Sequence, residues 1–153
     1  MSSLIALAGF VLIVLGFQRA RLDPVVLYAP PAWLGHLNAL FTLVAFILLA
    51  AAYVPGNRLR ARIGHPMVVA TKVWAFGHLL SIGLLHDVVL FGAFLVWAIV
   101  AFARLRRRDR AQGVTYAPGT LKGDMITVVV GVVAWALFAF WLHGALIGVR
   151  PFG

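Results

Sequence analysis

Residues 58–108 read RLRARIGHPMVVATKVWAFGHLLSIGLLHDVVLFGAFLVWAIVAFARLRRR. The stretch opens with alternating arginines, continues as a long apolar run interrupted by His86 and Asp87, and closes with further arginines. An apolar run of this length suits two membrane-spanning helices, because one span needs about 20 apolar residues. We therefore predict a helical hairpin with a tight turn at His86-Asp87, around which the rest of the chain packs.

Composition places the whole chain in a membrane. Of its 153 residues, 63% are hydrophobic and 11% charged, and the mean hydropathy is +1.02. Such a chain has too little polar surface to coat a water-soluble globule. Its length allows one domain over residues 1–153, all-α, a polytopic transmembrane helix bundle of about five spans. The predicted spans are residues 4–17, 34–54, 66–85, 88–103 and 124–147.

The basic residues explain the net charge of +9 without a nucleic-acid partner. Most of them lie between apolar runs, above all in residues 58–62 and 104–122. Because basic loops remain on the cytoplasmic side of bacterial membranes, we predict that both segments are cytoplasmic. The chain has no cysteine and no glutamate, which excludes disulfides, thiolate metal ligation and chemistry based on paired glutamates.

The histidines are the main candidates for a functional site. His78 lies deep in the third predicted span, where an ionisable side chain is costly and usually has a partner inside the bundle. It either ligates a haem held between facing helices or hydrogen-bonds a neighbouring helix. His65 lies 13 residues earlier, roughly 20 Å along the same helix, so the two cannot bind one metal ion. His36, His86 and His143 are expected near the outer ends of spans two, three and five.

His65 has two interpretations from its neighbours. With Arg62 and the first turn of the following helix, it would form a cationic pocket for a lipid phosphate or a cofactor carboxylate. Alternatively, it is a solvated histidine at the interface. Lys72, the only basic residue inside a predicted span apart from histidine, is expected to extend toward the cytoplasmic headgroups.

Three segments carry a family resemblance. They are VPGNRLRARIGHPMVVATKVWAFGHLL at residues 54–80, LFGAFLVWAI at 90–99 and LHGALIGVRPF at 142–152. Together they resemble the NnrU family of bacterial membrane proteins over nearly the whole chain. The specific feature is an R-x-G-H-P-M segment followed 13 residues later by G-H-L-L. The family is associated with denitrification and nitric oxide metabolism, and it is similar to the plastid 15-cis-zeta-carotene isomerase, a membrane enzyme that uses haem b.

The resemblance implies a site and a cofactor. His78 matches a haem-ligand histidine and would bind the iron of haem b, whereas His65 matches a motif of unassigned role. Family members usually begin with a further helix that carries a histidine, and this chain begins at what resembles their second span. His36 or His143 would then supply the second axial ligand. The implied protein lies in the bacterial inner membrane and has an isomerase-like activity dependent on haem or a role in nitric oxide metabolism.

The partners expected from these features are membrane lipids, a hydrophobic isoprenoid-like substrate and further copies of the chain. Two other classes stay open. An R-x-x-H-P motif, here Arg62 to Pro66, also opens a membrane helix in isoprenylcysteine and phospholipid methyltransferases, although the lack of glutamate matches those enzymes poorly. The other class is a non-catalytic membrane assembly factor.

Overall fold

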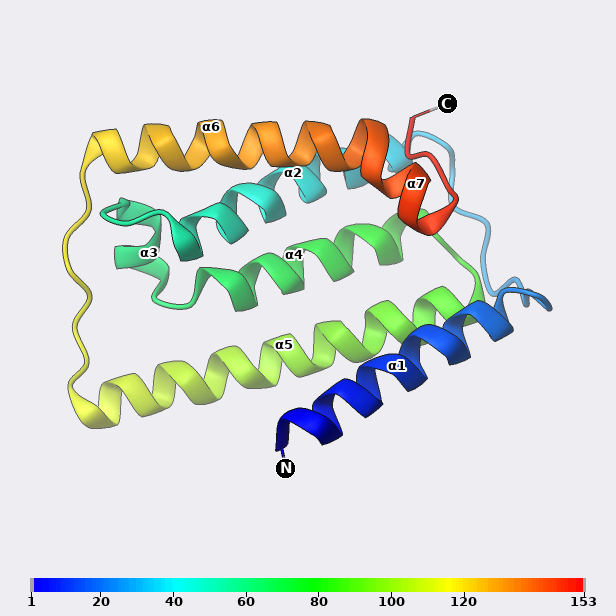
Figure 1. Ribbon diagram of the computed structural model, residues 1–153, viewed down its shortest axis with the longest axis horizontal. Coiled ribbons are helices and arrows are strands. Elements are labelled where there is room, and N and C mark those ends of the chain that lie inside the picture. Colours follow the sequence, from blue (N-terminus) through cyan, green and yellow to red (C-terminus); the bar gives the residue numbers. More distant parts are fainter. Residues whose placement is uncertain (1, 153) are drawn as a thin grey trace.

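Helices account for nearly all of the ordered architecture in the computed structural model, which describes residues 2–152. The elements are α1 (Ser2–Ala20), α2 (Leu34–Tyr53), α3 (Arg58–Ile63), α4 (Pro66–Ser81), α5 (Leu85–Gln112), α6 (Leu121–Leu137), the π-helical turn η1 (Phe138–Leu142) and α7 (His143–Ile147). The described residues form no β-sheet, so the predicted all-α class is confirmed. Figure 1 shows α2, α4, α5 and α6 running side by side along the long axis.

Within residues 2–152, four helical segments are long and apolar enough to cross a membrane, which makes this a membrane protein. They are α1, α2, α5 and the continuous segment Leu121–Ile147. The predicted third span is shorter than expected, because α4 has 16 residues. A helix of that length rises roughly 24 Å, less than the hydrocarbon thickness of about 30 Å. The expectation of five spans is therefore corrected to four full-length candidates plus α4.

The turn between α4 and α5 lies at residues 82–84 and not at His86-Asp87. The segment after α1 creates this break, since the Leu27 amide donates to the Gly83 carbonyl at 2.8 Å and the Leu85 amide donates to Val25 at 2.7 Å. Gly83 is required, because a Cβ there would lie 1.8 Å from the Tyr28 carbonyl oxygen. His86 consequently lies in the first turn of α5, and its predicted place at the end of the third span is wrong.

Small residues let α2 approach its two main neighbours, α4 and α6. A Cβ on Gly131 of α6 would lie 2.6 Å from the Ile47 backbone of α2, and one on Gly77 of α4 would lie 2.6 Å from the Asn38 side chain. Asn38 also donates to the Ser81 hydroxyl at 2.9 Å, which joins α2 to α4. Close approach of small residues, with polar side chains bonded between helices, is the usual packing inside membranes.

One end of the bundle collects the arginine-rich segments, as predicted. This arginine-rich end consists of α3, the C-terminal part of α5 and the loop 113–120, at the left in Figure 1. The loop is fixed to the α2–α3 connection, because the Thr120 amide donates to the Gly56 carbonyl at 2.7 Å. Asn57 is buried and caps α3 by accepting from the Arg60 amide at 2.7 Å. The opposite end carries α7 and the start of α2 (Figure 1).

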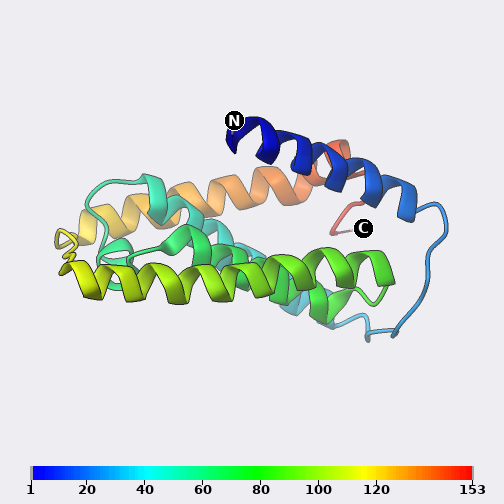
Figure 2. The ribbon, with the colours of Figure 1, turned by 90° about the horizontal axis from the view of Figure 1, so that it is seen from below.

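Helix α1 stands apart from the other helices. Among the described helices it packs only against α5, and none of its side chains is buried. Figure 2, seen from below, shows α1 lying outside the layer formed by α5 and its neighbours. Arg21, just beyond α1, donates to the Ile147 carbonyl at the end of α7 at 3.2 Å. This loose packing leaves a groove between α1 and α5.

Candidate functional site

His78 lies on α4 among aromatic side chains. Its Nδ1 is 2.9 Å from the Trp74 carbonyl oxygen, and its ring stacks on Phe91 with the ring centroids 4.5 Å apart. A carbonyl oxygen can only accept, so Nδ1 carries the proton and Nε2 keeps its lone pair. Within residues 2–152, no hydrogen bond engages Nε2. His78 therefore has the tautomer that an axial haem ligand needs.

The space around His78 does not suit a haem, although the Nε2 atom is free to bind iron. Phe91 covers one face of the imidazole, and Trp74 lies beside it with the ring centroids 5.3 Å apart. His78 lines neither of two cavities in the bundle, of about 870 and 290 Å³. In this arrangement the residues around His78 do not fit a porphyrin.

His36 and His143 lie at the end of the bundle where the sequence places them. His143 begins α7 directly after the π-helical turn, with its Nδ1 2.5 Å from the Val149 carbonyl oxygen. His36 is exposed in the first turn of α2. Among residues 2–152, no three histidine, cysteine or acidic side chains converge on a metal site.

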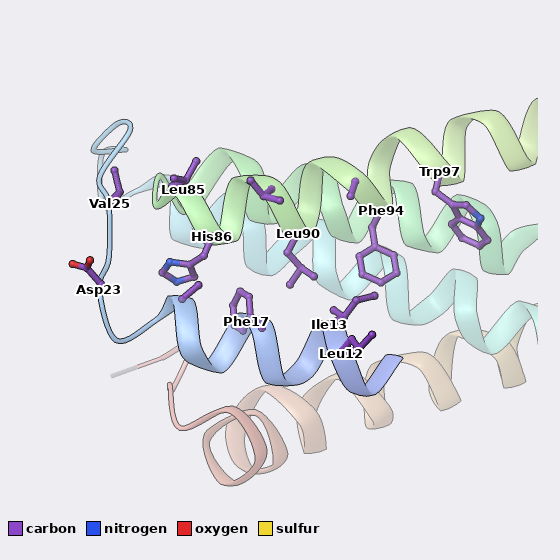
Figure 3. A pocket seen from close by; sticks show the side chains of 14 residues that line it. Leu12, Ile13, Phe17, Asp23, Val25, Leu85, His86, Leu90, Phe94 and Trp97 are labelled. Atoms are coloured by element: carbon purple, nitrogen blue, oxygen red, sulfur yellow. The ribbon is translucent and has the colours of Figure 1, made fainter. Parts of the chain in front are cut away.

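A groove of about 870 Å³ lies between α1 and α5. Figure 3 shows its side chains extending from the two helices toward each other. The lining residues are Leu12, Ile13, Gly16, Phe17, Ala20, Asp23, Val25, Leu85, His86, Val89, Leu90, Ala93, Phe94 and Trp97. The groove is thus apolar along its length and polar at the end near His86. Sequence reasoning missed it, because a groove depends on how far two helices stand apart.

His86 and Asp23 form the polar end of the groove. The His86 Nε2 lies 3.4 Å from an Asp87 carboxylate oxygen, and these side chains are only 9% and 11% exposed. The Phe17 ring meets the His86 ring edge to face, with the centroids 5.2 Å apart. His86 therefore connects the two walls of the groove, and it points toward α1 in Figure 3. The sequence predicted that His86 lies in a turn, and that position gave no indication of a place between α1 and α5.

A second polar cluster occupies the arginine-rich end. The His65 Nε2 lies 2.6 Å from the Asp109 carboxylate, to which the Tyr116 hydroxyl also donates. The Asp109 side chain is 5% exposed. Gly64 brings the three together, because its φ of +79° turns the chain and a Cβ there would lie 2.9 Å from the Tyr116 ring. His65 is thus paired with a carboxylate, a partner that neither interpretation of the sequence contained.

The cluster fixes the charge of its members. Asp109 and Tyr116 lie beyond the apolar part of α5, which ends at Ala103. The hydrogen bond from Tyr116 lowers the pKa of Asp109, and the contacts with His65 and Arg108 act in the same direction. Burial raises the pKa of Tyr116, and its bond to Asp109 raises it further. An ionised Asp109 therefore accepts from a neutral phenol at physiological pH.

Comparison with known proteins gives one result. A family model described as NnrU protein matches residues 1–151. No curated protein and no solved structure matches the chain.

Proposed function

Because the chain belongs to the NnrU family, we propose that it is a multi-pass protein of the bacterial inner membrane that binds an elongated, isoprenoid-like molecule between α1 and α5. The observation that carries this proposal is the apolar groove. The arginine-rich end lies in the cytoplasm in this proposal, because basic segments stay on that side.

The groove suits such a molecule in size and chemistry. Its volume of about 870 Å³ lies within the range of small-molecule sites. From Leu85 to Trp97 it follows α5 for roughly 18 Å at 1.5 Å per residue, long enough for an extended chain. Its open side between the two helices admits a ligand from the bilayer. His86 lies at one end and offers a ring nitrogen to an oxygen-bearing end of the ligand.

Retinol tests the proposal, because it is isoprenoid and accepts excitation energy from tryptophan. Ala93 lines the groove beside Trp97, so Ala93→Phe fills the space, whereas Ala103→Phe adds the same ring at an exposed position outside it. We expect energy transfer from tryptophan to bound retinol in the wild type and in Ala103→Phe, and little in Ala93→Phe. Equal transfer in all three proteins would show that the groove is not the site.

Haem b binding is the second candidate, and the free Nε2 of His78 is the observation that favours it. An isomerase-like activity of the kind that the resemblance implies would use this cofactor, which supplies an iron centre when bound. Since the residues around His78 leave no room for a porphyrin, we assign no reaction step to it. A haem held by His78, with His36 or His143 as the second ligand, would require the side chains packed around His78 to rearrange.

An absorption spectrum tests this second candidate. Protein from haem-sufficient cells should show a Soret band that shifts on reduction, and His78→Ala should remove the band while His65→Ala keeps it. A spectrum without the band would remove the haem candidate and leave the groove proposal intact. The absence of both haem and retinol binding would favour a non-catalytic assembly role.

A further inference from the structure

Helix α5 continues past its apolar part into a strongly basic segment. Residues 85–103 are almost wholly apolar and rise roughly 28 Å, which matches the hydrocarbon thickness of about 30 Å. The next residues, RLRRRDR at 104–110, therefore lie at the level of the lipid headgroups. Lys72 of α4 extends toward the same level, since its Nζ lies 3.9 Å from the centre of the Phe102 ring.

Three of these arginines share one exposed face. A helix turns by about 100° per residue, which places Arg104, Arg107 and Arg108 within roughly 100° of one another. All three are exposed, whereas Asp109, about 100° further round the helix than Arg108, is buried. Val100 and Val96, about one and two turns before Arg104, are exposed on the same side as Arg104 and Arg107. The face therefore combines an apolar surface with cations directly beyond it.

The aspartates at the arginine-rich end do not neutralise the positive charge of the face formed by Arg104, Arg107 and Arg108. Of the four aspartates in the chain, only Asp109 and Asp124 lie there. Asp109 is held inward by His65 and Tyr116, although its second oxygen lies 3.7 Å from Arg108. Asp124 pairs instead with Arg58 at 3.6 Å.

We propose that Arg104, Arg107 and Arg108 bind the phosphate of an anionic phospholipid. Guanidinium groups match phosphate oxygens in geometry and charge, and basic clusters next to a membrane span attract anionic lipids. Free phosphate would use the same arginines, but only a lipid also places its acyl chains against Val96 and Val100. The site is separate from the α1–α5 groove, so it does not depend on the proposed isoprenoid ligand.

Two variants with the same change in charge test this site. The variant R104Q/R107Q/R108Q removes the three arginines of the proposed site. The control variant R62Q/R110Q/K122Q removes three exposed basic residues that lie at the same end of the bundle but outside that face. Cardiolipin binding to the full chain in detergent would be measured by native mass spectrometry, with phosphatidylcholine as the neutral comparison. Excess inorganic phosphate would be added in a parallel series.

We expect the face variant to bind cardiolipin at least about tenfold more weakly than the control variant, because each arginine beside the membrane contributes about fivefold. Phosphatidylcholine binding should stay the same in all proteins. Equal losses in the two variants would show a diffuse charge effect and overturn the site. Full displacement of cardiolipin by inorganic phosphate would overturn the choice of a lipid as the ligand.

Discussion

At the scale of single residues, the G-H-P segment shows how much of a motif depends on distant partners. Pro66 at the start of α4 follows from local rules, since a proline at the first helical position loses no hydrogen bond. His65 could be singled out from its place beside Pro66, but its partners Asp109 and Tyr116 lie 44 and 51 positions away. Nothing in a single sequence predicts that pairing. His78 was predicted as interior, whereas its stacking on Phe91 depends on how α4 meets α5.

Tyr116→Phe should destabilise the protein, because it removes the hydroxyl that donates to the buried Asp109 carboxylate. For a chain of this size, loss of one such bond corresponds to a fall in melting temperature of roughly 2–4 °C. Tyr53→Phe is the matched control, because Tyr53 is exposed at the end of α2. Thermal unfolding in detergent measures both variants. An equal melting temperature in Tyr116→Phe and Tyr53→Phe would contradict a stabilising role for the cluster.

The cluster of His65, Asp109 and Tyr116 should also make the stability of the protein depend on pH in the acid range. The pKa of Asp109 is lowered by folding, so its contribution is present above the ordinary carboxyl pKa and is lost as the pH falls through the lowered value. The pKa of Tyr116 is raised, so its contribution is present below the ordinary phenol pKa and is lost as the pH rises through the raised value. Melting temperatures of wild type and Asp109→Asn across the acid range should converge as the pH falls. A constant difference would refute the assignment.

At the scale of elements, local signals predicted the helices better than the connections between them. The end of α2 was placed within one residue, because Pro55 and Gly56 stop the helix. The turn after α4 was misplaced, because it is made by hydrogen bonds from residues 25–28, far away in the chain. The glycines that pack closely, Gly77 and Gly131, were also missed, since only the partner helix reveals the approach.

Gly83→Ala should disturb the α4–α5 turn, because the new Cβ would lie 1.8 Å from the Tyr28 carbonyl oxygen. We expect a loss of about 1–3 kcal/mol in stability, the usual effect of forcing an extra carbon into a packed site. Gly92→Ala on α5 is the control, since a Cβ there meets nothing within 4 Å. It should leave stability equal or higher, because alanine favours helix more than glycine does. Chemical or thermal unfolding that ranks the two variants in the reverse order would contradict the structure.

At the scale of the whole molecule, the hydrophobic pattern was sufficient to predict the helix bundle but not the cavities between its helices. Apolar runs and arginine clusters predicted the membrane class and the grouping of basic segments at one end. The groove could not be predicted, since it results from the loose packing of α1 on α5. Composition says how apolar a helix is, but not how closely it approaches another.

Topology is the prediction that belongs to this scale. Because Thr120 bonds to Gly56, the α2–α3 and α5–α6 connections must lie on the same side of the membrane. Reporter fusions at Asn57 and Gln112 should therefore both report the cytoplasm, and one at Pro30 the periplasm. Periplasmic signals at both Asn57 and Gln112 would reverse the proposed orientation. Opposite signals at these two positions would contradict the fold itself.

The sparse packing of α1 has a consequence for biogenesis. A helix without buried side chains adds little to the folding of its neighbours, and α2, α4, α5 and α6 hold one another through contacts that do not involve it. Insertion into the bilayer and association with the bundle are therefore separate events for α1. Because few contacts hold α1 to α5, separating the two helices would cost little while the apolar surface of α1 stays in lipid. Lateral diffusion of a single helix would then govern when a molecule enters the groove and when it departs.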